Sequence, residues 1–109
     1  MQPDTEQVIL IDKINIPKDS IVEYTEKSLY IRKTLKQQPG FVKFESYQHK
    51  HNNGNLQVIT VVTWKNQKAM EDAKLNILEA LQKTGINMSK FLEEQGITME
   101  KGIYQAVME

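Results

Sequence analysis

Cysteine is absent from the 109 residues of this chain. Its absence excludes disulfide bonds, thiolate nucleophiles and thiolate metal sites together. No apolar run approaches the roughly 20 residues that a membrane-spanning helix needs. The opening residues, M-Q-P-D-T-E-Q, are polar and acidic and do not resemble a secretory signal. We therefore expect a soluble protein of the cytoplasm that does not contact a membrane.

An excess of one charge sign is lacking too. The chain has 14 basic and 14 acidic side chains, which are mixed along its length and give a formal net charge of zero. Since no basic stripe matches the phosphate backbone of a nucleic acid, we expect no nucleic-acid partner. The length suits one domain with one core. We assign residues 1–109 to a single domain, with its core at about residues 8–108.

Proline and glycine are few, and they stand where the pattern of the chain changes. Pro39 denies the preceding residue helical geometry, and Gly40 tolerates the left-handed turn of a helix exit. Asn53 and Gly54 lie between two alternating apolar runs, which is the strongest short-range signal for a hairpin. The sequence therefore predicts a helix, a strand, a reversal at Asn53-Gly54 and a second strand that ends near Trp64.

Alternation of apolar residues predicts the strands. In the first strand, residues 8–16, one face is expected to be buried and the other to meet solvent or a partner. The hairpin strands are expected at residues 41–50 and 56–65, and a final strand at residues 97–108 with a bulge or bend near Gly102. The expected buried face of the first strand holds Val8, Leu10, Asp12, Ile14 and Ile16, and the opposite face holds Ile9, Ile11, Lys13 and Asn15.

Apolar residues at helical spacing predict helices at residues 17–38, 66–84 and about 89–95. Ser20 and Glu23 have the spacing of a capping box, and Asn66 can cap the second helix. Gly85 is expected to close that helix. The expected buried stripes of the two longer helices are Ile21, Tyr24, Ser28, Ile31 and Leu35, then Met70, Ala73, Ile77, Ala80 and Leu81.

The order of these elements predicts an α+β fold of the ferredoxin-like, split β-α-β kind. Such a domain has a four-stranded antiparallel sheet with helices on one face. The opposite face carries Ile59 and Val61, which are too apolar to be left in water. We therefore expect a homodimer in which two such faces meet, that is, a dimeric α+β barrel.

Two segments resemble a known family. The run Q-P-G-F, followed by T-V-V-T-W-K-N-Q-K-A-M-E-D-A, is similar to the antibiotic biosynthesis monooxygenases, a family of dimeric α+β barrels. That family typically shows Pro-Gly-Phe after its first helix and a W-x-[ST/N]-x-x-A-[F/M] run at the start of its second. The resemblance covers residues 8–108, and its motifs are structural, so they indicate the fold more strongly than the reaction.

The resemblance implies several chemistries. The family includes cofactor-independent oxygenases of polyketide aromatics, quinol monooxygenases, haem-degrading enzymes and members with no assigned activity. The haem-degrading branch has an asparagine, a tryptophan and a histidine where this chain has Asp12, Ala73 and Lys83. All three differ, so we expect neither haem nor another cofactor.

Asp12 and Tyr24 are the candidate catalytic residues. The carboxylate of Asp12 lies on an otherwise apolar face, where it needs a partner or its pKa rises. It can border a pocket between the helices and the sheet, or it can be held by hydrogen bonds to helix or loop groups. Asn15 could assist, but the strand pattern places it on the opposite face.

Trp64, Tyr47, Tyr104 and Met70 are the candidate substrate-pocket residues. Trp64 has a second interpretation as a core anchor, since large aromatic side chains more often pack than react. An oxygenase without a cofactor needs an electron-rich substrate such as a phenol or hydroquinone. Its site must remove a proton, hold the anion beside dioxygen and exclude water. The first functional hypothesis is thus a cofactor-independent monooxygenase for a small aromatic or quinol substrate.

The second hypothesis is a non-catalytic dimeric barrel that binds a small apolar ligand or serves as a stress-related accessory protein. A cleft filled by Met70, Leu29 or Phe91 would favour it, whereas an open cavity holding Asp12 would favour catalysis. His49 and His51 are two residues apart at the hairpin tip and could share a metal ion. No third ligand is near them in the sequence, so we expect solvated histidines and no metal site.

Overall fold

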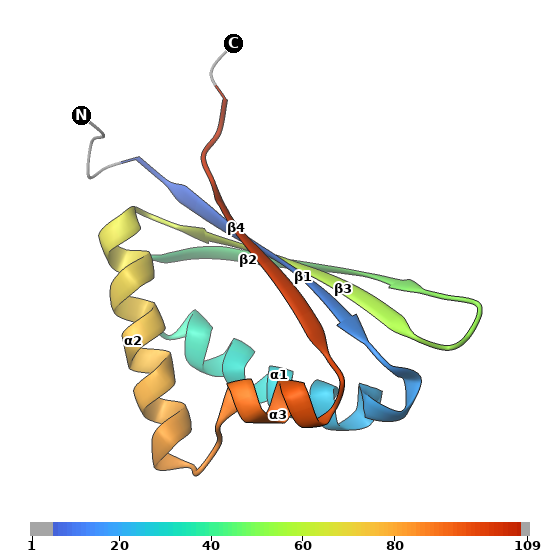
Figure 1. The fold of residues 1–109 in the computed structure, drawn as a ribbon. Coiled ribbons are helices and arrows are strands. Elements are labelled where there is room, and N and C mark those ends of the chain that lie inside the picture. Colours follow the sequence, from blue (N-terminus) through green and yellow to red (C-terminus); the bar gives the residue numbers. More distant parts are fainter. Residues whose placement is uncertain (1–5, 108–109) are drawn as a thin grey trace.

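The computed structural model describes residues 6–107 and shows a four-stranded antiparallel sheet with its helices on one side (Figure 1). The strand order is β2-β3-β1-β4, which is the predicted ferredoxin-like topology. The predicted α+β fold is therefore confirmed. The elements are β1 (Val8–Ile16), α1 (Ile21–Lys36), β2 (Phe41–Lys50), β3 (Leu56–Trp64), α2 (Gln67–Lys83), α3 (Met88–Glu94) and β4 (Thr98–Tyr104).

The first strand has the predicted orientation. Val8, Ile14 and Ile16 are almost completely buried, whereas Lys13 and Asn15 are exposed. Because neighbouring side chains of a strand point to opposite faces, this pattern fixes which face of the sheet lies under the helices. We call it the helix face and the other the open face. The predicted end of the last strand, Met108, lies outside the described residues.

The bulge of the sheet is not where the sequence placed it. Pairing of β4 with β1 runs through Gly102 without a shift in register, so the expectation of a bulge there is wrong. The Tyr104 ring folds over Gly102, and a Cβ at this position would lie 2.5 Å from that ring, so a side chain here would require the exposed ring to move. The register shifts between Phe41 and Lys43 at the start of β2. This shift reverses the faces of every later residue in β2.

Two separate apolar clusters form the core between the sheet and the helices. The first holds Val8, Leu35, Val62, Trp64, Met70 and Ala73. The second holds Ile14, Ile16, Tyr24, Leu56, Val58 and Ile97. Because α1 contributes Tyr24 to one cluster and Leu35 to the other, it crosses the helix face from end to end.

The start of α1 differs from the prediction. A short 3-10 turn, Lys18–Ser20, precedes the helix, and the Ser20 side chain makes no cap hydrogen bond. Its hydroxyl instead donates to the carbonyl of Gln95 at 2.9 Å. The expected capping box is therefore wrong, because Ser20 is buried and joins the start of α1 to the end of α3.

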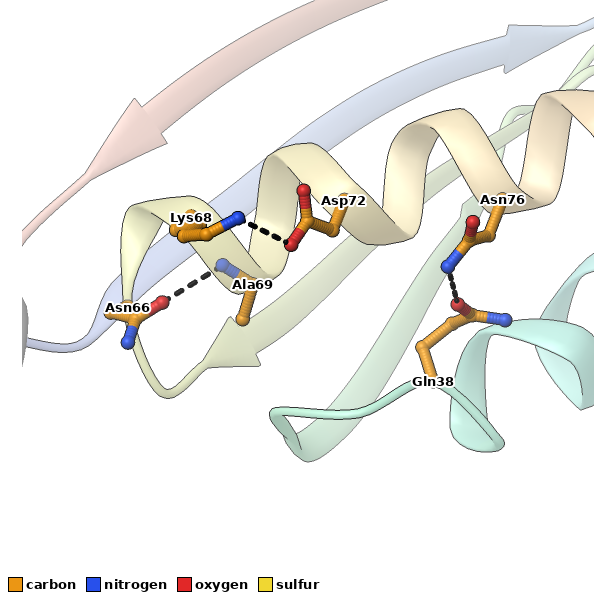
Figure 2. A network of polar contacts seen from close by, with 6 residues as sticks. All are labelled: Gln38, Asn66, Lys68, Ala69, Asp72 and Asn76. Atoms are coloured by element: carbon orange, nitrogen blue, oxygen red, sulfur yellow. Dashed lines mark hydrogen bonds and ion pairs between the residues drawn. The ribbon is translucent and has the colours of Figure 1, made fainter.

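The start of α2 is as predicted (Figure 2). The side chain of Asn66 accepts a hydrogen bond from the backbone N–H of Ala69 at 2.8 Å, which satisfies one of the free donors at the helix start. Further along, the Asn76 amide donates to Gln38 at 3.0 Å and joins α2 to the end of α1. Gly40 lies against the same helix in a left-handed conformation, with φ of 83°. A Cβ there would lie 2.5 Å from that of Ala69, so only glycine fits this approach.

Candidate functional site

A row of polar residues crosses the helix face between the two apolar clusters. In the strand register Ser46 is opposite Thr60, Thr60 is opposite Asp12, and Asp12 is opposite Lys101. Side chains directly opposite in neighbouring strands point to the same face. Since Asp12 shares the face of Ile14, all four point to the helix side. We call Ser46, Thr60, Asp12 and Lys101 the polar row.

The polar row divides the core. On one side lie Phe44, Val62 and Leu10, which belong to or pack on the first cluster. On the other side lie Val58, Ile14 and Met99, which belong to or pack on the second. A domain of this size gains most stability from one continuous core. Ser46 and Lys101 are exposed on the edge strands, whereas Asp12 and Thr60 are half-buried on the central strands. Asp12 and Thr60 therefore interrupt the core at its centre, which indicates a role for them other than packing.

Asp12 is the charged residue at the centre of the row. It is half-buried, and its Oδ1 atom is shielded from solvent with no hydrogen-bond partner among the described residues. Burial raises the pKa of the Asp12 carboxyl, and the neighbouring charge of Lys101 partly opposes this shift. A buried carboxylate with a raised pKa is a stronger base than an exposed one, which is the property that proton abstraction requires.

Tyr24 approaches the same region from α1. It is buried in the second cluster, and burial raises the pKa of its hydroxyl. The charge of Arg32 lowers that pKa, and the charge of Asp12 raises it. The structure thus places both candidate catalytic residues on the helix face, where the charges of Asp12 and Arg32 both act on Tyr24.

Sequence reasoning missed Arg32. Its guanidinium lies over the ring of Phe44, 4.7 Å from the ring centre, and its Nε atom is shielded without a hydrogen-bond partner. Phe44 is in the row of residues next to the polar row. A signal was present in the sequence, because Arg32 directly follows Ile31 in the apolar stripe of α1. Thr60 was missed likewise, although it is the one polar residue between Leu56 and Trp64 on its face of β3.

Trp64 and Met70 lie in the first apolar cluster and not beside Asp12. Trp64 is 2% exposed and makes an edge-to-face contact with Phe41, with ring centres 6.0 Å apart. Its indole N–H has no partner among the described residues. These contacts favour the interpretation of Trp64 as a core anchor. Ala73 is buried in the same cluster, whereas Lys83 is exposed and pairs with Glu79.

Tyr47 and Tyr104 lie on the open face, so the expectation that they line a pocket between helices and sheet is wrong. Tyr47 pairs with Ile59, and Tyr104 pairs with Ile9. In an unbroken strand Tyr47 would share the face of Phe41, but the bulge at the start of β2 moves it to the other side. Tyr47 is exposed and donates a hydrogen bond to Glu45 at 2.8 Å, which raises the pKa of the tyrosine.

The remaining candidates are at the surface. Asn15, His49 and His51 are exposed, and the two histidine rings make an edge-to-face contact with centres 4.8 Å apart. In residues 6–107 no group of three or more histidine, aspartate or glutamate side chains is placed to hold a metal ion. In the same residues no helix is long and apolar enough to cross a membrane.

Two hollows on the surface of the described residues stand out, and Asp12 lines neither. One, of about 300 Å³, lies between Lys27 and α3; the other, of about 530 Å³, lies between Pro39 and the first half of α2. Met70 and Phe91 pack in or on the two apolar clusters, and Leu29 is exposed.

The fold is shared with solved monooxygenases. A monooxygenase candidate from Shewanella loihica PV-4 aligns with a TM-score of 0.73 at 20% identity, over 95% of this chain and 97% of that one. A variant of SnoaB, a cofactor-independent oxygenase from Streptomyces nogalater, gives 0.69 at 16% identity, over 95% and 96%. An antibiotic biosynthesis monooxygenase candidate from Deinococcus radiodurans gives 0.69 at 14%, over 94% of each. The chain has the fold of the antibiotic biosynthesis monooxygenases.

This fold confirms the resemblance drawn from the two sequence segments, at the level of architecture. A dimeric ferredoxin-like protein from an uncultured marine organism also aligns, with a TM-score of 0.61 at 17% identity over 95% of this chain and 98% of that one. Neither the protein-family models nor the curated protein sequences include a match to the chain. At these identities the likeness describes the fold and leaves the reaction to the residues of the site.

Proposed function

We propose that the protein is a cofactor-independent monooxygenase that oxidises a small hydroquinone-type or other electron-rich aromatic substrate at the polar row. The observation that carries the proposal is the half-buried carboxylate of Asp12, with an unpaired oxygen and a raised pKa, at a break between two apolar clusters. The fold shared with a cofactor-independent oxygenase supports it.

The chemistry needs only the substrate and dioxygen. Asp12 takes a proton from the activated position of the substrate, and the electron pair left behind forms a bond to dioxygen. The resulting peroxide anion takes up a proton to become a hydroperoxide, which loses water and leaves a carbonyl. In an anthrone-type substrate a CH₂ group and O₂ thus give C=O and H₂O. In a hydroquinone Asp12 takes the proton from a hydroxyl, and that O–H and a ring C–H supply the two hydrogens of the water. Tyr24, whose raised pKa keeps its hydroxyl protonated, donates a hydrogen bond to the anion. The apolar clusters on both sides of the row exclude water.

The active form in this proposal is a homodimer. The open face presents half-buried Ile9, Ile11, Ile59 and Val61 beside the exposed Tyr47 and Tyr104. An apolar face of this kind is typical of a surface that meets a partner. A second copy of the chain would cover it with the same residues, as in a two-fold interface.

Oxygen uptake tests the proposed reaction. Wild-type protein, in a buffer with a metal chelator and without flavin, is mixed in an oxygen electrode with each compound of a panel of hydroquinones and anthrone-type compounds. We expect uptake with at least one compound, and its loss by about a hundredfold or more in Asp12→Asn. Tyr24→Phe should retain folding and lose part of the rate. Equal uptake by Asp12→Asn would refute the role given to the carboxylate.

The second candidate is a non-catalytic barrel that binds a small apolar ligand, as a stress-related or accessory protein. The packing of Met70 and Phe91 into the core, and two hollows that lie away from Asp12, favour it. The same compounds separate the two functions. A compound that raises the midpoint of thermal unfolding but consumes no dioxygen would favour the binding protein.

A further inference from the structure

Arg32 has a donor that no described part of the chain uses. Its Nε atom is shielded from solvent and meets no acceptor, while the guanidinium rests on the ring of Phe44. Stacking on an aromatic ring fixes the plane of a guanidinium. In this plane its N–H groups form a rigid fork that matches the two oxygens of a carboxylate. A donor held in this way is suited to an anionic ligand.

Positive charge is in excess near the polar row. Arg32 and Lys36 both lie over the Phe44 ring, at 4.7 and 5.7 Å from its centre. Lys101 is opposite Asp12 in the sheet and acts on the charge of that carboxylate. The polar row thus has one carboxylate, Asp12, with Lys101 opposite it in the sheet and Arg32 over the neighbouring Phe44. A ligand with one negative charge complements this arrangement better than a neutral one.

We propose that the substrate of the polar row is an aromatic acid, whose carboxylate is bound by Arg32 while its hydroxyl faces Asp12. The inference rests on the proposed function and narrows its substrate class from hydroquinones to hydroquinones that carry a carboxylate. Within residues 6–107, Arg32 Nε is a donor without an acceptor and Asp12 Oδ1 is an acceptor without a donor, and the charges of both residues act on Tyr24. A ligand that satisfies both must carry an acceptor and a donor.

Anaerobic titration calorimetry with three probes tests this inference. The probes are gentisate, which has two hydroxyls and a carboxylate, its neutral methyl ester, and its dimethoxy analogue, which keeps the acid and lacks the hydroxyl protons. We expect wild type to bind gentisate at least about tenfold more tightly than the ester, because a charge-assisted hydrogen bond to the carboxylate is lost in the ester.

Variants assign the selectivity to residues. In Arg32→Gln the affinity for gentisate should fall to that for the ester, and the affinity for the ester should stay the same. Arg32→Lys keeps the positive charge but not the forked N–H groups, and it should keep part of the preference for gentisate over the ester. It replaces Arg32→Gln in this test if that variant folds poorly. Lys36→Gln, which removes an exposed cation over the same ring, should change the affinity for gentisate less than about threefold.

The outcomes separate this inference from the proposed function. Ester binding as tight as gentisate binding in wild type, or unchanged selectivity in Arg32→Gln, would overturn the aromatic-acid inference and leave the proposed function standing. Asp12→Asn should lose the preference for gentisate over the dimethoxy analogue while it keeps the preference for gentisate over the ester. If it keeps both, the proposed role of Asp12 fails and that of Arg32 stands. No binding of any probe at millimolar concentration would overturn the aromatic-acid inference.

Discussion

Asp12 couples the stability of the folded chain to pH. Burial raises the pKa of its carboxyl in the folded state, so the folded protein binds this proton more tightly than the unfolded chain does. This tighter proton binding stabilises the folded chain. The stabilisation is fully present below the ordinary aspartate pKa and is lost as the pH rises through the raised pKa of the folded state. At neutral pH a half-buried charge remains, which destabilises the fold.

We therefore expect Asp12→Asn to be more stable than wild type at pH 7, by on the order of 1 kcal/mol. The difference should shrink as the pH falls towards the ordinary aspartate value, because the wild-type carboxyl is then protonated too. Urea denaturation at a series of pH values measures both effects. Asp19→Asn, which removes an exposed carboxylate, controls for net charge. A difference that does not change with pH would contradict the raised pKa.

Ser20 should contribute to stability through Gln95 and not through a capping box. Ser20→Ala leaves the carbonyl of Gln95 without its donor in a part-buried position, and we expect a loss of about 1–2 kcal/mol. Glu23→Ala should be nearly neutral, since Glu23 is exposed. Thermal unfolding of the two variants compares the two interpretations. If both substitutions lower the midpoint equally, the helix has the capping box after all.

Individual residues were predictable where a local pattern determines their environment. Asp12 was recognised as a half-buried carboxylate because Val8, Leu10, Ile14 and Ile16 surround it at strand spacing. The bond between Ser20 and Gln95 was not predictable, because these residues are 75 positions apart and no local pattern links them. Arg32 was missed because its position depends on its contact with Phe44, and the bulge decides that Phe44 points to the helix face.

Among the elements, the joint between β2 and α2 places the strictest demand on a single residue. Gly40 and Gly85 both have left-handed backbones, with φ of 83° and 78°. A Cβ at Gly40 would lie 2.5 Å from the Cβ of Ala69, whereas at Gly85 nothing lies within 4 Å. Alanine at Gly85 would therefore introduce backbone strain alone, whereas alanine at Gly40 would introduce the same strain and a steric clash.

We expect Gly85→Ala to lower the free energy of unfolding by about 1 kcal/mol, since the left-handed conformation is strained for any residue with a Cβ. Gly40→Ala should lower it by about 1–3 kcal/mol more, because α2 must move away from the sheet. Denaturant unfolding of the two variants measures the difference. Equal losses would mean that α2 does not pack closely on this turn.

The elements were predicted well because periodicity and breakers agree along the chain. Asn66 and Gly85 bound α2 as expected, and the sheet order follows from the order of elements. The bulge was not predictable, since F-V-K-F offers an apolar residue to either face. This one-residue shift moved Tyr47 away from the expected pocket and brought Ser46 into the polar row.

For the whole molecule, the open face of the sheet leads to a prediction about assembly. We expect wild type to be a dimer in light scattering coupled to size-exclusion chromatography. Val61→Lys should yield monomers, because it places a charge at the centre of the proposed interface. Val22→Lys, on an exposed position of α1, should leave the dimer intact. A monomeric wild type at micromolar concentration would contradict the proposed homodimer.

The polar row exists only in the assembled sheet. Its members come from four strands, and their alignment depends on the registers of three strand pairs. Sequence patterns within one strand do not reveal such a row, which is why the sequence indicated Asp12 and not its neighbours. Polar residues that interrupt a core reduce stability, and proteins keep such residues where function needs them.

The central claim is that the polar row serves chemistry and not folding. Oxygen uptake and unfolding free energy, measured at pH 7 on one preparation each of wild type and Asp12→Asn, test it most directly. The account predicts that uptake with the best substrate falls by about a hundredfold or more, while stability is equal to or above that of wild type. Retained uptake, or a clear loss of stability in Asp12→Asn, would contradict it.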